Sequence, residues 1–420
     1  MSQQNKTSFP KDFLWGASTA GHQVEGGNQN QWTVWEQQNA ERLAKTADVR
    51  LKNVPVWGEI KELAQNPKNY ISGKGVEHYT RYKEDFDLLK QLNLNAFRFS
   101  IEWSRIEPAE GSWDEDEIKH YREYIEELKK RDIEPILNIW HWTMPTWFTA
   151  KGGFEKRANI DYFVRFSEKI IQEYGSDLKY IITLNEPSVY MSKGYLVKDW
   201  PPGQRSLINA LKVYFNLAKA HRRAYGRIKD MNPELQVGIA AQLANIQAKR
   251  PNNLADRFST KLMRYFWNWW FLLRIRRQQD FIGINYYFTD YYTGAFKRKN
   301  PKLPINDLGW YMEPEGLYPL LIRTWTRFKK PILVSENGLA DMNDKYRQWW
   351  IEETIVSMQR AISEGVEVKG YLHWSLLDNF EWAEGWWPKF GLVEVDKEQG
   401  MKRTVRQSAR WFADKIKELS

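Results

Sequence analysis

The sequence predicts an α/β protein whose strands close into a (β/α)8 barrel, and three observations favour this architecture. Strand-like and helix-like segments alternate eight times along the 420 residues, as a barrel of eight βα units requires. Two similar apolar runs, 180–187 and 331–338, read as buried parallel strands, and each contains a carboxylate beside a Pro or Gly turn signal. Polar or aromatic residues also follow most other strands, where such barrels keep their chemistry. The alternative is an open doubly wound sheet, but no Gly-rich phosphate turn follows the first strand.

Each element is predicted from its local pattern. Strands are expected where short apolar runs end in polar or turn-forming residues: 13–18, 96–101, 134–140, 180–184, 236–242, 280–286, 331–335 and 368–375. Helices are expected where apolar residues recur with a helical period: 79–92, 114–130, 161–174, 207–231, 256–277, 315–328, 345–365 and 404–419. In the first helix, for example, Tyr82, Phe86 and Leu89 share one stripe. Asn232-Pro233 and Gly365 are explicit stop signals.

The remaining length is expected to lie in long βα loops of one domain. A bare barrel takes about 250 residues, so residues 1–420 hold a large surplus. The longest loop, 26–75, shows no clear period and is predicted to be irregular. No Pro/Ser-rich linker divides the chain, so we expect a single domain with long βα loops.

Composition excludes several classes of protein. Cysteine is absent, so neither disulfides nor thiolate metal sites are possible. The six His residues show no ligand spacing with Asp or Glu, so no metal or other cofactor is expected. The N-terminal residues 1–8 are polar, unlike a secretory signal, and no run approaches the ~20 apolar residues of a membrane span. The predicted compartment is the cytoplasm.

The net charge of +9 is interpreted as a solvated basic surface. The cations are mostly dispersed, and the densest groups, 274–277 and 297–299, belong to no recognisable nucleic-acid module. We therefore expect neither nucleic acid nor a membrane as a partner. A homo-oligomer is possible.

The side chains at the predicted strand ends suit a ligand that is rich in hydroxyl groups. Amide and carboxylate oxygens accept hydrogen bonds from hydroxyls, while amide and imidazole N–H groups donate to them. Each residue alone has an ordinary explanation, such as a helix cap, a satisfied core histidine or a buried ion pair. Together, with two opposed carboxylates, they form the arrangement that glycosidic bond cleavage requires. The residues are Gln23, Arg98, His141, Asn185, Glu186, Asn285, Tyr287, Glu336, Trp374, Glu381 and Trp382.

The chain resembles glycoside hydrolase family 1, the retaining β-glucosidase and β-galactosidase family, from Phe9 to Trp411. This resemblance implies a TIM barrel, the fold that the pattern of elements also predicts. The motifs that carry it are Gln23-Val24-Glu25-Gly26, Trp140-His141-Trp142, Thr183-Leu184-Asn185-Glu186-Pro187, Ile284-Asn285-Tyr286-Tyr287, Ser335-Glu336-Asn337-Gly338, and the last strand through Glu381-Trp382 to Phe390-Gly391-Leu392.

The resemblance also implies roles for individual residues. Glu336 is the expected nucleophile and Glu186 the expected acid/base, with carboxyl groups about 5–5.5 Å apart as in retaining enzymes. Support for the nucleophile is expected from Arg98, Tyr287 and Asn285. Substrate binding is expected from Gln23, His141, Asn185, Trp374, Glu381, Trp382 and Phe390.

The implied activity is that of a retaining exo-β-glycosidase acting on β-glucosides and also on β-galactosides or β-fucosides. A carboxylate at Glu381, facing the O4/O6 side of the sugar, repels a 6-phosphate, so unphosphorylated substrates are expected. Two alternatives stay open. One is a transglycosidase that uses a sugar acceptor, and the other is a non-catalytic carbohydrate-binding barrel.

The sequence departs from the family pattern between the fifth and sixth strands, where the chain is shorter than expected. The loops 292–309 and 338–344 also look short, so a broad tolerance for leaving groups is expected. The short segment holds the aromatic run 265–271. We interpret this run as core packing. An uncovered run would instead serve as an oligomer interface or an interfacial membrane contact beside the neighbouring arginines.

Overall fold

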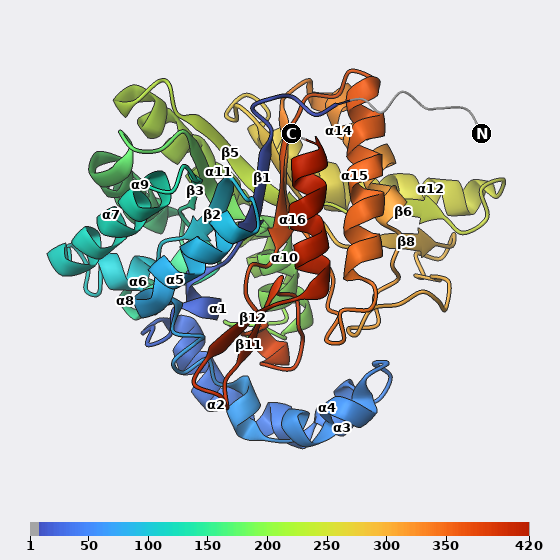
Figure 1. Ribbon diagram of the computed structural model, residues 1–420, viewed down its shortest axis with the longest axis horizontal. Helices are drawn as coiled ribbons and strands as arrows, with labels where there is room; N and C mark the ends of the chain where they lie inside the picture. Colours follow the sequence, from blue (N-terminus) through green and yellow to red (C-terminus); the bar gives the residue numbers. More distant parts are fainter. Residues whose placement is uncertain (1–7, 420) are drawn as a thin grey trace.

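The structure of this protein is a computed structural model, which describes residues 8–419; the N-terminal residues 1–7 and Ser420 lie outside the described part. Eight parallel strands close into a ring in the order β1, β10, β9, β7, β5, β4, β3, β2 (Figure 1). The predicted (β/α)8 barrel is confirmed. The strands are β1 Leu14–Ser18, β2 Ala96–Ser100, β3 Glu134–Asn138, β4 Tyr180–Asn185, β5 Gln236–Gln242, β7 Ile282–Tyr286, β9 Ile332–Asn337 and β10 Val368–Trp374.

Helices follow each strand and cover the outside of the ring (Figure 1). The long ones are α5 His78–Gln91, α7 Glu115–Lys129, α9 Ile160–Tyr174, α11 Leu207–Met231, α12 Leu254–Arg264 continuing into α13 Trp270–Ile275, α14 Leu317–Phe328, α15 Arg347–Ser363 and α16 Gln407–Leu419. Short helices α1 Gly21–Val24, α6 Trp103–Ile106, α8 Thr146–Ala150 and α10 Pro187–Ser192 lie in the βα loops. Every predicted helix is present. The predicted start of the last helix at residue 404 is wrong, because β12 Lys402–Val405 pairs there with β11 Val393–Asp396.

The prediction of an irregular loop at 26–75 is also wrong, because much of this stretch is helical. The helices are α2 Gln31–Lys45, α3 Ala47–Arg50 and α4 Trp57–Ala64. The side chain of Asn30 caps α2 by accepting from the backbone N–H groups of Trp32 and Thr33. The inner face of α2 buries Trp32, Trp35 and Leu43. Its many Asn and Gln residues obscure this stripe in the sequence, although Gln is a good helix former.

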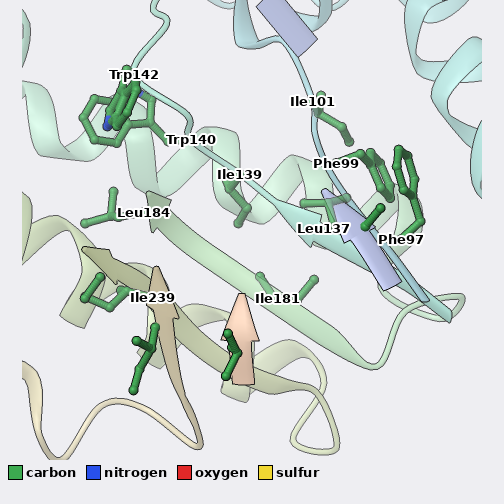
Figure 2. Close-up of a cluster of buried hydrophobic side chains, with 14 of the residues drawn as sticks. Phe97, Phe99, Ile101, Leu137, Ile139, Trp140, Trp142, Ile181, Leu184 and Ile239 are labelled. Atoms are coloured by element: carbon green, nitrogen blue, oxygen red, sulfur yellow. The ribbon is translucent and has the colours of Figure 1, made fainter. Parts of the chain in front are cut away.

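The alternation of side chains along the strands separates the helix-facing core from the barrel interior. Phe97 and Phe99 of β2 lie together in the core that also holds Leu137, Ile139 and Ile181 (Figure 2). Arg98, between the two phenylalanines, therefore points into the barrel. A separate layer fills the interior below the site: Ala96, Ile136, Tyr180, Ile182, Ala240, Phe281, Leu333 and Leu372.

The helix after β5 is interrupted by a π-helical turn, Tyr265–Trp269, between α12 and α13. The expected core packing of the aromatic run holds for only part of it. Trp269 and Phe271 are buried, whereas Tyr265 and Phe266 are 41% and 48% exposed. Beside this helix, β6 Asn245–Ala248 pairs with β8 Thr289–Tyr292 in a small separate sheet. Among the helices within residues 8–419, none combines the length and apolarity needed to cross a bilayer.

Candidate active site

Two buried carboxylates face the barrel interior at the ends of β4 and β9. Glu186 is 5% exposed and Glu336 4%. Strict alternation from Ile182, which is in the interior layer, would point Asn185 outward. The register between β4 and β5 shifts between these two residues, which turns Asn185 inward. Glu186 follows with a positive φ of 43°, an uncommon conformation that directs a non-glycine side chain at a functional site.

The carboxylate oxygens of Glu336 accept from two donors. Arg98, fully buried, donates from Nη1 to Glu336 Oε1 and forms an ion pair with it. The Tyr287 hydroxyl donates to Glu336 Oε2 at 2.6 Å. Burial, then the charges of Glu336 and Glu186, raises the pKa of Tyr287 well above its usual value, so this hydroxyl keeps its proton. A buried carboxylate with a guanidinium on one oxygen and a phenol on the other is poised as a nucleophile.

Glu186 sits in surroundings that favour the protonated acid. Burial raises its pKa well above the usual range, and the negative charge of Glu336 raises it further. Asn285 Nδ2 donates to Glu186 Oε1 at 2.7 Å, and this contact partly opposes the shift. On sequence grounds Asn285 was expected among the supports of the nucleophile; in the structure its amide bonds to Glu186 and Asn185.

Asn185 is fixed at the centre of this polar network. Its Oδ1 accepts from Arg98 Nη2 at 2.7 Å, and its Nδ2 lies 3.0 Å from His141 Nε2. Burial and the charge of Arg98 lower the pKa of His141 well below its usual value, so the imidazole is neutral. Both side chains are thus locked in orientation before any ligand binds, which favours precise placement of a sugar hydroxyl.

Gln23 and Glu381 lie on the opposite side of the barrel from β5. Gln23 Nε2 donates to Asn379, to the carbonyl of Phe380 and, at 3.3 Å, to Glu381 Oε2. Within residues 8–419, Gln23 Oε1 is buried without a partner. A buried acceptor of this kind costs free energy unless a ligand hydroxyl fills it. Glu381 keeps some exposed surface, but desolvation, Glu384 and Glu336 raise its pKa to about 8.

Aromatic rings surround these polar groups. Trp382 stacks on His22 at 5.6 Å and contacts Trp142, and Trp374 stacks on His141 at 5.9 Å. Phe390 packs against Tyr287 at 6.3 Å. The structure therefore brings the predicted site residues Gln23, Arg98, His141, Asn185, Glu186, Asn285, Tyr287, Glu336, Trp374, Glu381, Trp382 and Phe390 to one end of the barrel.

Three neighbours of the site were not anticipated from the sequence. Trp200 packs on Trp142 at 4.5 Å, and Trp310 contacts Tyr287 at 5.9 Å. Both belong to loops whose tryptophans carry no positional signal in a single sequence. The third, Gln242, is the last residue of β5 and had a usable signal, because it is a polar strand end like the others.

Gln242 points into the barrel on the same side as Glu186. Ala240, two residues earlier, belongs to the interior layer, and Gln242 pairs in register with Asn285. Trp267 Nε1 donates to Gln242 Oε1 at 2.5 Å, which fixes the amide. Within the described part of the chain, Gln242 Nε2 is buried without an acceptor. This free donor is available to a ligand.

A metal site is not formed by these groups. Across residues 8–419 no cluster of three or more His, Asp or Glu side chains is arranged to hold a metal ion. The chemistry that the arrangement supports is that of one carboxyl group whose pKa is raised, Glu186, beside a second that is paired with an arginine, Glu336.

The fold and this pair of carboxyl groups fit a glycosidase, and comparison with known proteins agrees. The sequence model of glycosyl hydrolase family 1 matches residues 5–277 and 272–419. The chain belongs to this family and is a glycoside hydrolase. β-Glucosidase A of Thermotoga maritima is 30% identical, with 98% of each chain covered. The β-glycosidase from Pyrococcus horikoshii superposes with a TM-score of 0.85 at 33% identity, covering 99% of this chain and 96% of that one. A β-glucosidase from Thermotoga maritima, solved in complex with glucoimidazole, has a TM-score of 0.86 at 28% identity and 99% coverage of both chains.

The two matched segments meet at 272–277, directly after α13 begins. The chain was expected from its sequence to be shorter than the family pattern at this same place. The junction supports a shortened connection between β5 and β7, which is also the connection that supplies Trp267 to Gln242.

Proposed function

We propose that the protein is a retaining exo-β-glycosidase that removes an unphosphorylated β-glucosyl unit, and also β-galactosyl or β-fucosyl units, from the non-reducing end of a small glycoside. The observation that carries this proposal is the division of labour between the two carboxyl groups. Glu336 is paired with Arg98, whereas burial and the charge of Glu336 keep Glu186 protonated. We also infer that the chain acts as one catalytic domain, because both carboxylates and their supports come from one barrel.

The proposed reaction is a double displacement. Glu336 attacks the anomeric carbon while Glu186 gives its proton to the departing oxygen, which forms a glycosyl ester on Glu336. Ester formation removes the negative charge of Glu336. The pKa of Glu186 then falls, because one of the causes that raise it is gone. Glu186 can therefore accept a proton from water, which attacks the anomeric carbon and releases the sugar with its configuration retained.

The sugar contacts follow from the free polar atoms and the rings. The unpartnered Oε1 of Gln23 accepts from a sugar hydroxyl, with Glu381 as the adjacent partner. Asn185, held by Arg98 and His141, contacts the 2-hydroxyl, where a hydrogen bond strengthens in the transition state. Trp374 provides the stacking floor, and Trp382, His141 and Phe390 complete the binding residues.

A chromogenic assay tests the function directly. Aryl β-D-glucosides, galactosides and fucosides are each offered to the enzyme, and release of the phenol is measured. Turnover of at least one of them supports the proposal, and no turnover of any favours a carbohydrate-binding barrel. A sugar acceptor added to the assay distinguishes a hydrolase from a transglycosidase. In a transglycosidase, the main product is the glycosylated acceptor and not the free sugar.

Discrimination against 6-phosphorylated substrates is expected to depend on pH. The pKa of Glu381 is about 8, so this group is mostly neutral at pH 7, and the repulsion assumed from the sequence is only partly present there. Between about pH 7 and pH 9 Glu381 ionises while the phosphate stays doubly charged. The preference for the unphosphorylated glucoside in kcat/KM should rise about tenfold or more over this range. In Glu381→Gln, which keeps the shape, the preference should not change with pH; an equal rise in this variant would contradict the prediction.

Gln242 is expected to bind the leaving group. β5 stands opposite β1 in the ring, so Gln242 faces the glycone residue Gln23 from across the barrel, beside Glu186.

Gln242→Leu should lower kcat/KM for cellobiose about 2- to 10-fold, which corresponds to the loss of one neutral hydrogen bond. Aryl glucosides, which have no hydroxyl there, should change less than twofold. Trp267→Phe, which frees the Gln242 amide without removing it, is the matched control and should give a smaller loss on cellobiose. Equal losses on both substrates for Gln242→Leu would sink the assignment.

The enzyme is also expected to accept a broad range of leaving groups, because the connection between β5 and β7 is short. Comparable kcat/KM values for aryl glucosides and cellobiose in the wild type are the expected result. A strict preference for one leaving group would contradict it.

A further inference from the structure

The positive charge of this chain is concentrated in one segment. Residues 205–302 contain 19 Lys and Arg against 5 Asp and Glu, a net charge of +14, whereas the whole chain carries +9. The rest of the protein is therefore net negative. Individual basic groups are dispersed along the sequence, as expected above, but the two parts of the chain differ in sign. Segment 205–302 forms α11, α12, the π-helical turn, α13, the small β6–β8 sheet and the barrel strands β5 and β7.

Exposed apolar side chains collect on the helices of the same segment. Leu254 and Phe258 are four residues apart and share one stripe of α12, and Phe266 follows in the π-helical turn after it. They are 77%, 65% and 48% exposed. On α11, Ile208 and Phe215 are seven residues apart, which places them on one helical face, and they are also exposed. α12 lies at the outer edge of the molecule, beside β6 and β8 (Figure 1).

Trp270 joins Phe266 to the stripe on α11. Its ring lies 5.5 Å from that of Phe266 and 5.7 Å from that of Phe215. The guanidinium of Arg274 covers Phe215 at 4.4 Å. The exposed apolar residues Ile208, Phe215, Leu254, Phe258 and Phe266, which α11 and the helix after β5 carry, are together called the basic apolar face.

Cations that are not paired with a carboxylate border this face. Lys212, Arg257, Lys261 and Arg274 are exposed and lie on the same helices. Within residues 8–419, none of the four is paired with a carboxylate, in contrast to Arg250, which is bound to Asp256. The charges of the face are thus available to an external anion.

We propose that the basic apolar face binds the surface of an anionic lipid membrane. A helix with exposed aromatic and aliphatic residues flanked by Lys and Arg lies in the interfacial plane, with its apolar side among the acyl chains and its cations on the headgroups. The concentration of positive charge disfavours pairing of this face with a second copy of itself, because the like charges repel. Nucleic acid would use the cations but leave the apolar stripe uncovered. The proposal develops the alternative that the sequence left open for the aromatic run, an interfacial membrane contact beside the neighbouring arginines.

Vesicle co-sedimentation tests the proposal with the full chain. The wild type should bind vesicles of phosphatidylglycerol and phosphatidylcholine far more strongly than vesicles of phosphatidylcholine alone. Binding should weaken as salt is raised. A triple variant, Arg257→Gln, Lys261→Gln and Arg274→Gln, should lose about 100-fold in partition, since each cation near an anionic surface contributes about fivefold. The matched control, Lys45→Gln, Lys90→Gln and Lys119→Gln, makes the same change in net charge outside the segment and should bind like the wild type.

A second set of variants tests the apolar stripe. Leu254→Ser, Phe258→Ser and Phe266→Ser together should lower vesicle binding at least tenfold, because these apolar side chains no longer enter the membrane interface. Val49→Ser, Leu63→Ser and Val356→Ser, exposed elsewhere at 69%, 42% and 50%, are the control set and should have no effect. All variants should hydrolyse a water-soluble aryl glucoside at the wild-type rate, because none is part of the site.

Three outcomes would overturn the proposal. The first is equal binding to neutral and anionic vesicles, or no binding to either. The second is loss of binding in both the segment variants and their controls. The third is that another partner occupies the face. That partner would be a second copy of the chain if the protein is a homodimer that dissociates in the Ser triple variant. It would be nucleic acid if duplex DNA binds tightly through the three cations and independently of the apolar stripe.

Discussion

Replacing Glu336 by glycine is expected to reduce kcat for an aryl β-D-glucoside by on the order of 10⁴-fold or more, because the variant has no group to form the covalent intermediate. Azide or formate should restore part of the activity. A small anion can occupy the space of the lost carboxylate, where Arg98 and Tyr287 still present their donors. It attacks the anomeric carbon from the face that Glu336 used.

The product of that rescue identifies the role of the residue. An anion in place of the nucleophile gives an α-configured glycosyl product, because one displacement inverts the β-glycoside. Rescue with this product is the expected result. Full activity without an added anion, or a β-configured product, would contradict the role assigned to Glu336. Glu336→Gln is a useful companion, because it fills the same volume and should be neither active nor rescued.

Replacing Glu186 by glutamine is expected to have the second largest effect, and the effect should depend on the leaving group. The loss in kcat/KM should reach about 10²–10⁴-fold for cellobiose or an alkyl glucoside, whose departing oxygen needs a proton. It should be small for 2,4-dinitrophenyl glucoside, whose phenolate leaves unaided. The glycosyl enzyme then accumulates, since the introduced amide cannot act as a base toward water. Azide should speed its breakdown and give a β-glycosyl azide.

The pH profile offers an independent check on Glu186. In the free enzyme Glu186 must be protonated, and burial with the charge of Glu336 raises its pKa. Activity should therefore be present below this raised pKa and be lost as pH rises through it. In Glu186→Gln, assayed with the dinitrophenyl substrate, the alkaline loss of kcat/KM should disappear. An alkaline limb that is unchanged in this variant would assign the titration to another group.

The two carboxylates could be predicted from sequence because their signal is local. Each comes at the end of a short apolar run. A parallel strand that is buried on both faces is expected to have such a run. The partners of these residues are a different matter. Asn285 was placed with the nucleophile, yet its amide bonds to Glu186, because the register shift between β7 and β9 at Ile284 and Asn285 decides where it points. Such shifts leave no mark in one sequence.

Other features were missed for physical reasons that differ from case to case. The helix α2 was hidden by Asn and Gln residues on its solvent side, although the cap Asn30 was visible. The Gln242–Trp267 contact spans a helix with a π-helical turn, and this turn sets which aromatic ring reaches the barrel. The charge asymmetry of 205–302 was present in the sequence itself. It gained meaning only when the fold placed α13, which continues the helix of α12, beside α11.

Trapping of the glycosyl enzyme is the measurement that tests the central claim most directly. The wild type is incubated with 2,4-dinitrophenyl 2-deoxy-2-fluoro-β-D-glucoside, whose fluorine slows the second displacement, and is then digested and analysed by peptide mass spectrometry. The account predicts one sugar ester per chain, located on Glu336. An enzyme that turns over aryl glucosides yet carries no ester, or carries it on Glu186 or Glu381, would contradict it.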